Sequence, residues 1–378
     1  MTTMARRKVC FVLPSLAGGG AERAAVQILN ALDQTAWDRS MYLFKCEGPY
    51  LADLSSEVAL TAGGAQSRLG RWRELRHYIA ATNPDVVVSF LSYFTVLSAV
   101  RAAMTRARVV LHQQTPMTAF LEDADYGWRG SWRKRVFASV TRLGYSSADL
   151  VITSSRGVAD DLTAAFGVDP SRVRVVANPV DVGAVTAASA EALSPEDEAR
   201  WIRPVIVAAG RLAEAKNYPL LIDALVRLRT TIPARVFVLG QGDRGEALQR
   251  LAQERGVGDV IVWRGFRANP WKFMARADVF ALTSRYEGFG NVLIEAMACG
   301  VPVVATSSPG TRDIIRHGVD GLLVADHTPA LMAAALARVI ADAPTRARMA
   351  MAARETAAGF ALPVVTGVYD AVLREALA

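Results

Sequence analysis

Short apolar runs rich in β-branched residues recur along the chain, and between them lie longer segments whose apolar positions repeat at helical spacing. The first pattern is typical of buried strands and the second of amphipathic helices. Their alternation predicts an α/β fold with parallel sheets covered by helices on both faces. The predicted strands are Lys8–Leu13, Asp85–Phe90, Arg108–His112, Leu150–Ser154, Val173–Ala177, Val205–Ala209, Arg235–Leu239, Val260–Arg264, Val279–Thr283 and Pro302–Thr306.

A break in this alternation divides the chain in two. Residues 184–203 are rich in Ala, Ser, Glu and Pro and show no strand pattern, so we expect a linker there. We therefore predict two doubly wound, Rossmann-like domains over 1–183 and 204–359, and a last helix over about 360–378 that packs back on the first domain. Ligands of such sheets bind at the carboxyl ends of the strands, which predicts a site in a cleft between the two domains.

The composition is that of a folded protein. The 378-residue chain is 52% hydrophobic and 21% charged, which excludes wholesale disorder. Cys10, Cys46 and Cys299 have no paired spacing and indicate free thiols in a reducing cytoplasm. The apolar run near the N-terminus resembles a secretory signal, but Pro14 interrupts it and a glycine-rich turn follows, which favours a first β-strand. The longest apolar run, Val86–Val100, is too short to span a bilayer, so we expect a soluble or membrane-surface protein.

Two glycine-rich turns follow predicted strands. Gly18, Gly19 and Gly20 come after the first strand and open a helix, where free backbone amides suit a phosphate-bearing ligand. Gly240–Gly245 matches G-x-G-x-x-G and would by itself indicate a dinucleotide site. It follows the second strand of its domain rather than the first, however, and Asp259 precedes a strand instead of ending one. We therefore do not expect nicotinamide or flavin binding.

Charged residues follow two strands of the second domain. Arg211 and Lys216 lie in the loop after its first strand, where two cations can neutralise a diphosphate or simply face solvent. Glu287 precedes a helix predicted from about Gly290, and Glu295 lies about one turn inside that helix. A carboxylate can accept two hydrogen bonds from a vicinal diol, and a helix start can hold phosphate oxygens. This layout predicts a clamp on a nucleotide sugar rather than a hydrolytic pair, which needs both carboxylates at one glycosidic bond.

These residues resemble a known family. The run S-R-Y-E-G-F-G-N-V-L-I-E-A-M-A-C-G, from Ser284 to Gly300, contains the E-x(7)-E signature of the retaining glycosyltransferases of family four, which have the two-domain GT-B fold. The segments G-G-G-A-E-R, A-D-L-V-I-T-S-S, A-N-P-V-D, G-R-L followed by K-N, and V-D-G-L-L-V occur in family order, so the resemblance covers nearly the whole chain. A-N-P-V-D differs from the Asn-Gly that many members have at this domain-edge turn.

The resemblance implies an acceptor side in the first domain and a donor site in the second. The implied catalytic residues are His112 beside the sugar, Arg211 and Lys216 on the donor diphosphate, and Glu287 on the transferred sugar. Glu295 would hold the ribose hydroxyls. The implied donor-binding residues are Gly18, Gly19, Gly20, Arg211, Lys216, Phe266, Arg267, Glu287, Gly288, Phe289, Gly290, Asn291, Val292 and Glu295.

The implied reaction moves a sugar from a nucleoside diphosphate donor, with UDP as the expected nucleotide, to an acceptor hydroxyl with retention of anomeric configuration. Mechanisms proposed for the family are front-face, with the departing phosphate taking the acceptor proton, so catalysis rests on positioning and charge stabilisation. No D-x-D-like metal site stands out, and Arg211 with Lys216 can supply the electrostatic role of a metal. We therefore expect no cofactor and no metal.

A basic segment with tryptophans lies in the first half of the chain. Between Arg68 and Arg142 there are twelve Lys and Arg against five Asp and Glu, so an anionic partner would meet this region. Trp132, Val136, Val140 and Leu143 could line one helical face. Together with the arginines of a second basic stretch, Arg68, Arg71, Arg73 and Arg76, this suggests docking on anionic lipid at the inner face of the cell membrane. Ordinary packing of an amphipathic helix remains an alternative. The residues assigned to the membrane or acceptor side are Trp128, Arg129, Trp132, Arg133, Lys134 and Arg135.

Alternatives remain open for the acceptor and for the class of reaction. A lipid-linked saccharide of bacterial envelope polysaccharide assembly is the expected acceptor, and a soluble acceptor remains open. A GT-B-type epimerase would convert a nucleotide sugar without any acceptor, and a non-catalytic protein would only bind it. Nucleic acid binding has the charge but no recognisable module, so no nucleic-acid partner is expected.

Overall fold

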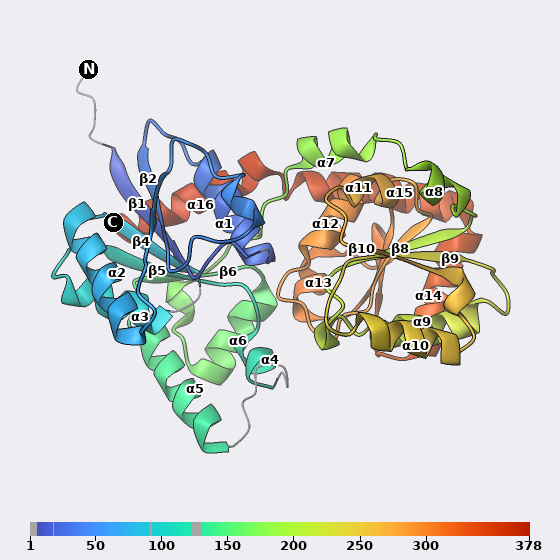
Figure 1. Cartoon of the computed structure of the whole chain (residues 1–378), viewed down its shortest axis with the longest axis horizontal. Helices are drawn as coiled ribbons and strands as arrows, with labels where there is room; N and C mark the ends of the chain where they lie inside the picture. Colours follow the sequence, from blue (N-terminus) through green and yellow to red (C-terminus); the bar gives the residue numbers. More distant parts are fainter. Residues whose placement is uncertain (1–5, 18, 91–92, 123–130) are drawn as a thin grey trace. The chain divides into compact units, whose positions relative to one another are not determined.

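The structure, a computed structural model, describes residues 6–17, 19–90, 93–122 and 131–378, except for the side chains of residues 93, 120, 122, 131–134 and 137. These residues form two compact units (Figure 1). One unit runs to Pro179 and includes Leu362–Ala378, and the other is Val180–Ala361. Each unit has a parallel sheet between helices, so the predicted α/β class with two doubly wound domains is confirmed.

The first unit has a seven-stranded parallel sheet of order β3-β2-β1-β4-β5-β6-β7. Its last helix comes from the far end of the chain and contacts α1 and β5. The elements in chain order are β1 (Arg7–Leu13), α1 (Gly20–Ala31), β2 (Trp37–Leu43), β3 (Ala59–Ala62), α2 (Arg68–Thr82), β4 (Val86–Phe90), α3 (Tyr93–Ala102), β5 (Arg108–Gln113), α4 (Met117–Glu122), α5 (Ser131–Ser146), β6 (Leu150–Thr153), α6 (Arg156–Phe166), β7 (Val173–Val175) and α16 (Leu362–Leu377).

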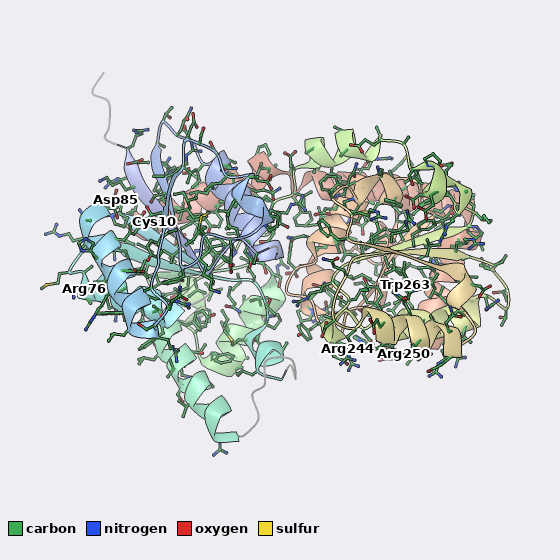
Figure 2. All side chains as sticks on the ribbon, in the orientation of Figure 1. Cys10, Arg76, Asp85, Arg244, Arg250 and Trp263 are labelled. Carbon is green, nitrogen blue, oxygen red and sulfur yellow. The ribbon has the colours of Figure 1, made fainter. Side chains whose placement is uncertain are left out.

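Alternating side chains of the central strand β1 build two cores, one on each face of this sheet. Phe11 packs with residues of α1 and α16, including Tyr369, whose ring centroid lies 6.0 Å from that of Phe11. Cys10, one residue earlier, points to the face covered by α2 and α3 (Figure 2). Burial raises the pKa of the Cys10 thiol to about 11, so this thiol is an inert part of the core.

Strands β2 and β3 of the first unit and β13 of the second are absent from the sequence-based prediction. In β2 the polar sequence Asp38-Arg39-Ser40 hides the strand pattern. Arg39 is nevertheless buried, because its guanidinium donates to the carbonyls of Leu29, Asn30 and Leu32 at the end of α1. A buried charge is tolerated where its donors are satisfied, and local patterning does not reveal such partners.

The second unit has a six-stranded parallel sheet of order β10-β9-β8-β11-β12-β13. Helices α9, α10 and α14 cover one face, and α11 and α12 cover the other (Figure 1). The elements are α7 (Val182–Ser189), α8 (Pro195–Ala199), β8 (Val205–Ala209), α9 (Tyr218–Leu228), β9 (Arg235–Leu239), α10 (Gly245–Glu254), β10 (Ile261–Gly265), α11 (Trp271–Met274), β11 (Val279–Leu282), α12 (Asn291–Ala298), β12 (Val303–Thr306), α13 (Pro309–Ile314), β13 (Gly321–Val324), α14 (Pro329–Ala341) and α15 (Ala343–Ala358).

The prediction of a linker over 184–203 is wrong, because these residues belong to the second unit. They contain most of α7 and the whole of α8. The carbonyl of Ala188 accepts from Asn269, and the buried Asp197 pairs with Arg264 of β10 at 2.6 Å. The Ala- and Glu-rich composition therefore encodes two short packed helices rather than a free connection.

The strand order creates a switch point in each sheet. In the first unit the order turns between β1 and β4, and in the second between β8 and β11. All strands of each sheet are parallel, so the loops that follow them lie at one edge. Loops that leave neighbouring strands in opposite directions open a crevice at the switch point, where α/β proteins bind their ligands.

Candidate functional site

An ion pair spans the switch point of the second unit. Lys216 lies in the loop after β8, Glu287 lies in the loop after β11, and the Lys216 ammonium contacts Glu287 Oε1. The two side chains are 25% and 12% exposed. The structure therefore brings together two predicted site residues that are far apart in the sequence.

The ion pair with Lys216 involves one of the two carboxylate oxygens of Glu287. Ser284, a buried hydroxyl that the sequence analysis did not single out, donates to the same Oε1 at 2.7 Å. Within the described ranges, neither contact involves Oε2, which can accept a hydrogen bond from a ligand. Nearby, burial and, to a lesser degree, the charge of Glu287 raise the pKa of Tyr218, whose hydroxyl donates to the Gly210 carbonyl at 3.1 Å.

The turn after Glu287 presents the start of α12. Gly290 precedes the helix with φ of 105°, a left-handed conformation that favours glycine. On the neighbouring helix α13, a Cβ added at Gly310 would lie 2.7 Å from backbone atoms of Gly288, so the Glu287–Gly290 turn packs closely against α13. The Phe289 ring is buried against Phe360, with centroids 5.6 Å apart, so this residue contributes backbone rather than a ring to the site.

Glu295 is buried inside α12 and has an indole partner. Its Oε2 accepts from Nε1 of Trp271 at 2.9 Å, and the side chain is 6% exposed. Trp271 opens α11 and escaped the sequence analysis, since nothing local links it to a residue 24 positions later. Burial chiefly, and the Glu295 charge second, raise the pKa of the neighbouring Cys299 to about 12. The carboxylate is thus held in one orientation.

The other predicted donor-side residues are more exposed. Arg211, in the loop after β8, is exposed, and the structure records no hydrogen bond or ion pair of its guanidinium within the described residues. Phe266, after β10, is 65% exposed, and Arg267 donates to the Phe266 carbonyl. Asn291 and Val292, the first residues of α12, are half-buried. These positions all lie at the carboxyl edge of one sheet.

The G-x-G-x-x-G turn after β9 serves a structural purpose. The Leu212 amide donates to the Gln241 carbonyl at 3.0 Å, which fastens this turn to the loop that carries Arg211. A Cβ at Gly240 would lie 2.0 Å from the Gly210 carbonyl oxygen, and one at Gly242 would lie 2.4 Å from the Leu212 carbonyl oxygen. These glycines are therefore required for close backbone packing.

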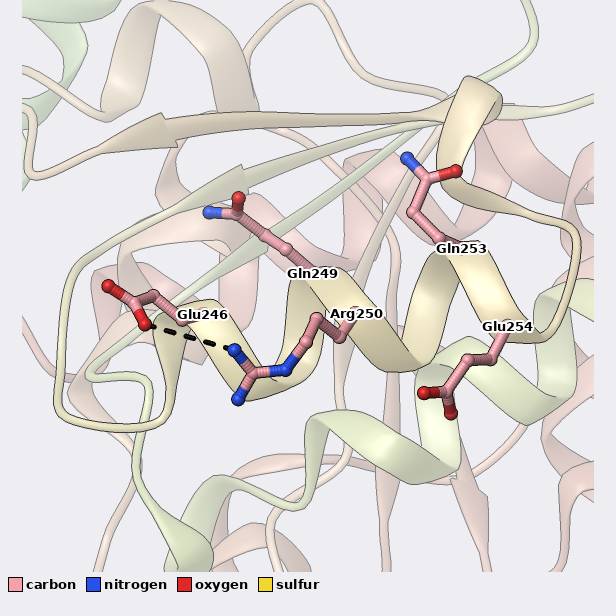
Figure 3. Close-up of a pocket in the computed structure, with 5 residues that line it drawn as sticks. All are labelled: Glu246, Gln249, Arg250, Gln253 and Glu254. Carbon is pink, nitrogen blue, oxygen red and sulfur yellow. Dashed lines mark ion pairs between the residues drawn. The ribbon is translucent and has the colours of Figure 1, made fainter.

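Two charged features beside this turn are ordinary surface. Arg244, at the start of α10 (Figure 2), pairs with Glu214, which also pairs with Arg285 at 2.8 Å. A hollow of about 480 Å³ lies along α10, but every residue that lines it belongs to that one helix, including the ion-paired Glu246 and Arg250 (Figure 3). A single helix face without convergent groups from other elements does not enclose a ligand.

In the first unit, His112 ends β5 within a hydrogen-bonded network. Its Nε2 accepts from the Gln114 amide at 2.8 Å, so its Nδ1–H is left to donate to the Tyr369 hydroxyl at 3.2 Å. Gln114 and Asn178 exchange two hydrogen bonds of 2.8 and 2.7 Å. Burial lowers the pKa of His112 to about 3, so the imidazole is neutral and its tautomer is set by these neighbours.

The other predicted site residues belong to the first unit. Gly19 and Gly20 are exposed at the start of α1. Gly18, Trp128 and Arg129 lie outside the described residues, as do the side chains of Trp132, Arg133 and Lys134. Arg135, on α5, is described and is exposed.

The outer face of α5 carries an apolar stripe. Val136, Val140 and Leu143 follow one another at helical spacing and are 54%, 39% and 60% exposed. On the side toward α6, Arg142 donates to the Phe166 carbonyl. None of the helices in the described ranges combines the length and apolarity needed to cross a bilayer.

The part of the chain that the structure describes contains no evident set of metal ligands. No group of three or more His, Cys, Asp or Glu side chains converges there. The expectation of metal-independent activity stays a prediction.

Comparison with protein families matches both halves of the chain. Residues 18–184 match the family described as Glycosyltransferase Family 4. Residues 191–356 match the family described as Glycosyl transferases group 1.

Two similar proteins match over most of their own length. One relative, 32% identical over 84% of this chain and 86% of its own, is the N-acetylgalactosamine-N,N'-diacetylbacillosaminyl-diphospho-undecaprenol 4-alpha-N-acetylgalactosaminyltransferase of Campylobacter jejuni. Another, 27% identical over 93% of this chain and 94% of its own, is the lipopolysaccharide core biosynthesis glycosyltransferase LpsE of Rhizobium meliloti. Among solved structures, Anabaena HepE in complex with UDP has a TM-score of 0.81 at 22% identity, with coverage of 97% of this chain and 100% of its own.

The packing of the G-x-G-x-x-G turn generates a prediction. Gly242→Ala should lower the free energy of unfolding of the second unit by about 1–3 kcal/mol, because the new methyl group overlaps the Leu212 backbone. Gly245→Ala is the matched control, since its Cβ would meet only the Leu212 side chain at 3.5 Å and Gly245 begins α10. It should change stability by less than about 0.5 kcal/mol. Urea denaturation of both variants measures the difference, and equal destabilisation would contradict the packing role.

Proposed function

The chain belongs to the family-four-like glycosyltransferases of the GT-B fold, and on that premise we propose that it moves a sugar from a UDP-sugar to an acceptor hydroxyl with retention of anomeric configuration. The observation that carries the proposal is the Lys216–Glu287 pair at the switch point of the second unit, beside the start of α12. A cation, an anion-binding helix start and a carboxylate converge there, which suits a diphosphate joined to a sugar.

The donor would redistribute this ion pair. Lys216 and the exposed Arg211 would meet the two phosphates, while Glu287 Oε2 would accept from a sugar hydroxyl. Because Lys216 and Glu287 are partly buried, breaking their ion pair costs free energy unless a new partner replaces the lost one. A donor diphosphate would be that partner for Lys216. The amides of residues 288–291 would hold the distal phosphate.

The nucleoside end would lie along β10 and α12. Glu295, held by Trp271, would accept from the ribose hydroxyls, and backbone near Phe266 and Arg267 would read the base. UDP as the nucleotide is supported by the Anabaena structures, which include complexes with UDP and with UDP-glucose.

The proposed reaction is the front-face transfer that the family resemblance implies. The acceptor oxygen forms a bond to the anomeric carbon as the bond from that carbon to the diphosphate oxygen breaks on the same face. The departing phosphate takes the acceptor proton, and Arg211 and Lys216 stabilise the charge that develops on it. His112 of the first unit is neutral, and to contact the transferred sugar its Nε2 would exchange the Gln114 amide for a sugar hydroxyl.

We propose a lipid-linked or envelope saccharide as the acceptor in bacterial polysaccharide or glycolipid assembly. The similar proteins of Campylobacter jejuni and Rhizobium meliloti act, by their names, on a diphospho-undecaprenol-linked sugar and in lipopolysaccharide core biosynthesis. The exposed stripe Val136, Val140 and Leu143 beside Arg135 suits the inner surface of an anionic membrane, where such acceptors are anchored.

Donor binding is testable by thermal shift against a panel of nucleotide sugars. One UDP-sugar at a hundredfold excess over its Kd should stabilise the protein by about 2.7 kcal/mol and raise the Tm. Glu287→Ala should lose this response, because it removes the carboxylate that holds the sugar. Glu246→Ala, on the exposed face of α10, is the matched control and should respond like the wild type. A failure of every nucleotide sugar to shift the Tm would refute the proposed function.

Metal independence is tested by turnover in excess EDTA. Activity should be undiminished, because Arg211 and Lys216 supply the positive charge, whereas Lys216→Met should lower kcat/KM by about 10²–10³-fold. Loss of activity in EDTA with recovery on addition of Mn²⁺ would show that a metal does this work instead.

Membrane contact is tested by co-sedimentation with vesicles that contain phosphatidylglycerol. Wild-type protein should sediment with them at low salt, and Leu143→Glu should reduce the bound fraction severalfold, because a charge enters the apolar stripe. Met104→Glu adds the same charge at a 92% exposed residue outside the stripe and serves as the control. Equal binding of both variants would argue that α5 does not face the membrane.

A further inference from the structure

A second hollow lies at the carboxyl edge of the first unit's sheet. It has a volume of about 310 Å³ and is lined by residues from the loops after β1 and β2, from the first turn of α2 and from α3. Because α3 follows β4, this cavity adjoins the switch point between β1 and β4. Unlike the hollow along α10, it is lined by side chains from several different elements.

Its lining has an excess of positive charge. Lys45, Arg68 and Arg71 line the cavity together with a single carboxylate, Glu47. The nearest approach of Lys45 to Glu47 is 3.7 Å, and both side chains are more than half exposed, so this pair is weak. Arg71 uses its Nε to donate to the Ala65 carbonyl, which holds the guanidinium in place.

The placement of the two arginines is electrostatically unfavourable without a ligand. Arg68 begins α2 and Arg71 lies in the same first turn, where the helix dipole is positive and where this helix has no acidic residue. Glu74, one turn later, accepts from the amides of Gly64 and Ala65 instead. An anion in the cavity would relieve the repulsion and gain from the helix dipole at the same time.

Two of the loops that line the cavity are fastened to each other by backbone hydrogen bonds. The Lys45 amide donates to the Pro14 carbonyl, and the Leu16 amide donates to the Glu47 carbonyl, each at 2.9 Å. A Cβ at Gly48 would lie 1.8 Å from the Leu16 carbonyl oxygen, so the two loops are in close contact. The loop that carries Lys45 is therefore held against the loop after β1.

We propose that this cavity binds a phosphate or diphosphate group of the acceptor. That the bound group belongs to an acceptor rests on the proposed function. That an anion binds here rests on the cavity and the residues that line it. Three cations and the hydroxyls of Ser15 and Thr95 offer donors on several sides, which suits a tetrahedral dianion better than a planar carboxylate. The volume, equal to about ten water molecules, accommodates a diphosphate.

The test is calorimetric titration of the full chain with inorganic pyrophosphate at physiological salt. The wild type should bind two equivalents, one in this cavity and one at the proposed donor site. Arg68→Gln/Arg71→Gln should weaken one of them by about tenfold or more, because two charge-assisted donors are lost. Arg73→Gln, exposed on the same helix and outside the cavity lining, is the matched control.

The outcomes separate the two proposals. If Arg211→Ala/Lys216→Ala abolishes all binding and Arg68→Gln/Arg71→Gln changes nothing, the cavity inference is overturned and the donor site stands. If only Arg68→Gln/Arg71→Gln weakens binding, the cavity stands and the donor site fails. An equal loss in Arg73→Gln would show general attraction of anions to a basic helix and would also overturn the inference.

The source of the phosphate is resolved by two further titrants. Glucose 6-phosphate represents a soluble acceptor, and farnesyl diphosphate represents a lipid-linked one. If one of these titrants binds to the wild type and to Arg73→Gln but not to Arg68→Gln/Arg71→Gln, the site is supported, and that titrant identifies the source of the phosphate. Binding of both that survives the double substitution would contradict it.

Discussion

Parallel strand pairing is the constraint on which the rest of this molecule depends. A parallel neighbour can be reached only by a crossover, so helices cover both faces and the loops that follow the strands gather at one edge. Charged residues from distant parts of the sequence meet there. Lys216 and Glu287 come together across β8 and β11, and Lys45 and Arg71 gather near β1 and β4.

Both units fasten these loops in the same physical way. The loop after the second strand of each sheet is hydrogen-bonded to the loop after the first, and glycine permits the close approach, at Gly48 in one unit and at Gly240 in the other. Backbone hydrogen bonds hold these loops without using the side chains, which stay available to a ligand.

At the carboxyl edges of both sheets, charged side chains lie where they destabilise the ligand-free protein, and a bound ligand would offset this destabilisation. Lys216 and Glu287 are partly buried as an ion pair, while Arg68 and Arg71 occupy the unfavourable end of a helix. Glu295 is held by Trp271, and His112 is held neutral by burial beside Gln114 and Tyr369. Such preorganisation suits a transferase, which stabilises charge by position rather than by rearrangement.

The amino-acid sequence by itself determined the alternation of strands and helices, the two doubly wound units and the order of Glu287 and Glu295 around the start of a helix. These features follow from local periodicity and turn chemistry. Only the tertiary structure decided that the polar β2 is a strand, that residues 184–203 pack on the second unit, and that Gly240 and Gly242 serve backbone contact. The partners Trp271 for Glu295 and Gln114 for His112 also emerged there, because contacts between distant elements depend on how crossovers place them, which no local window of sequence contains.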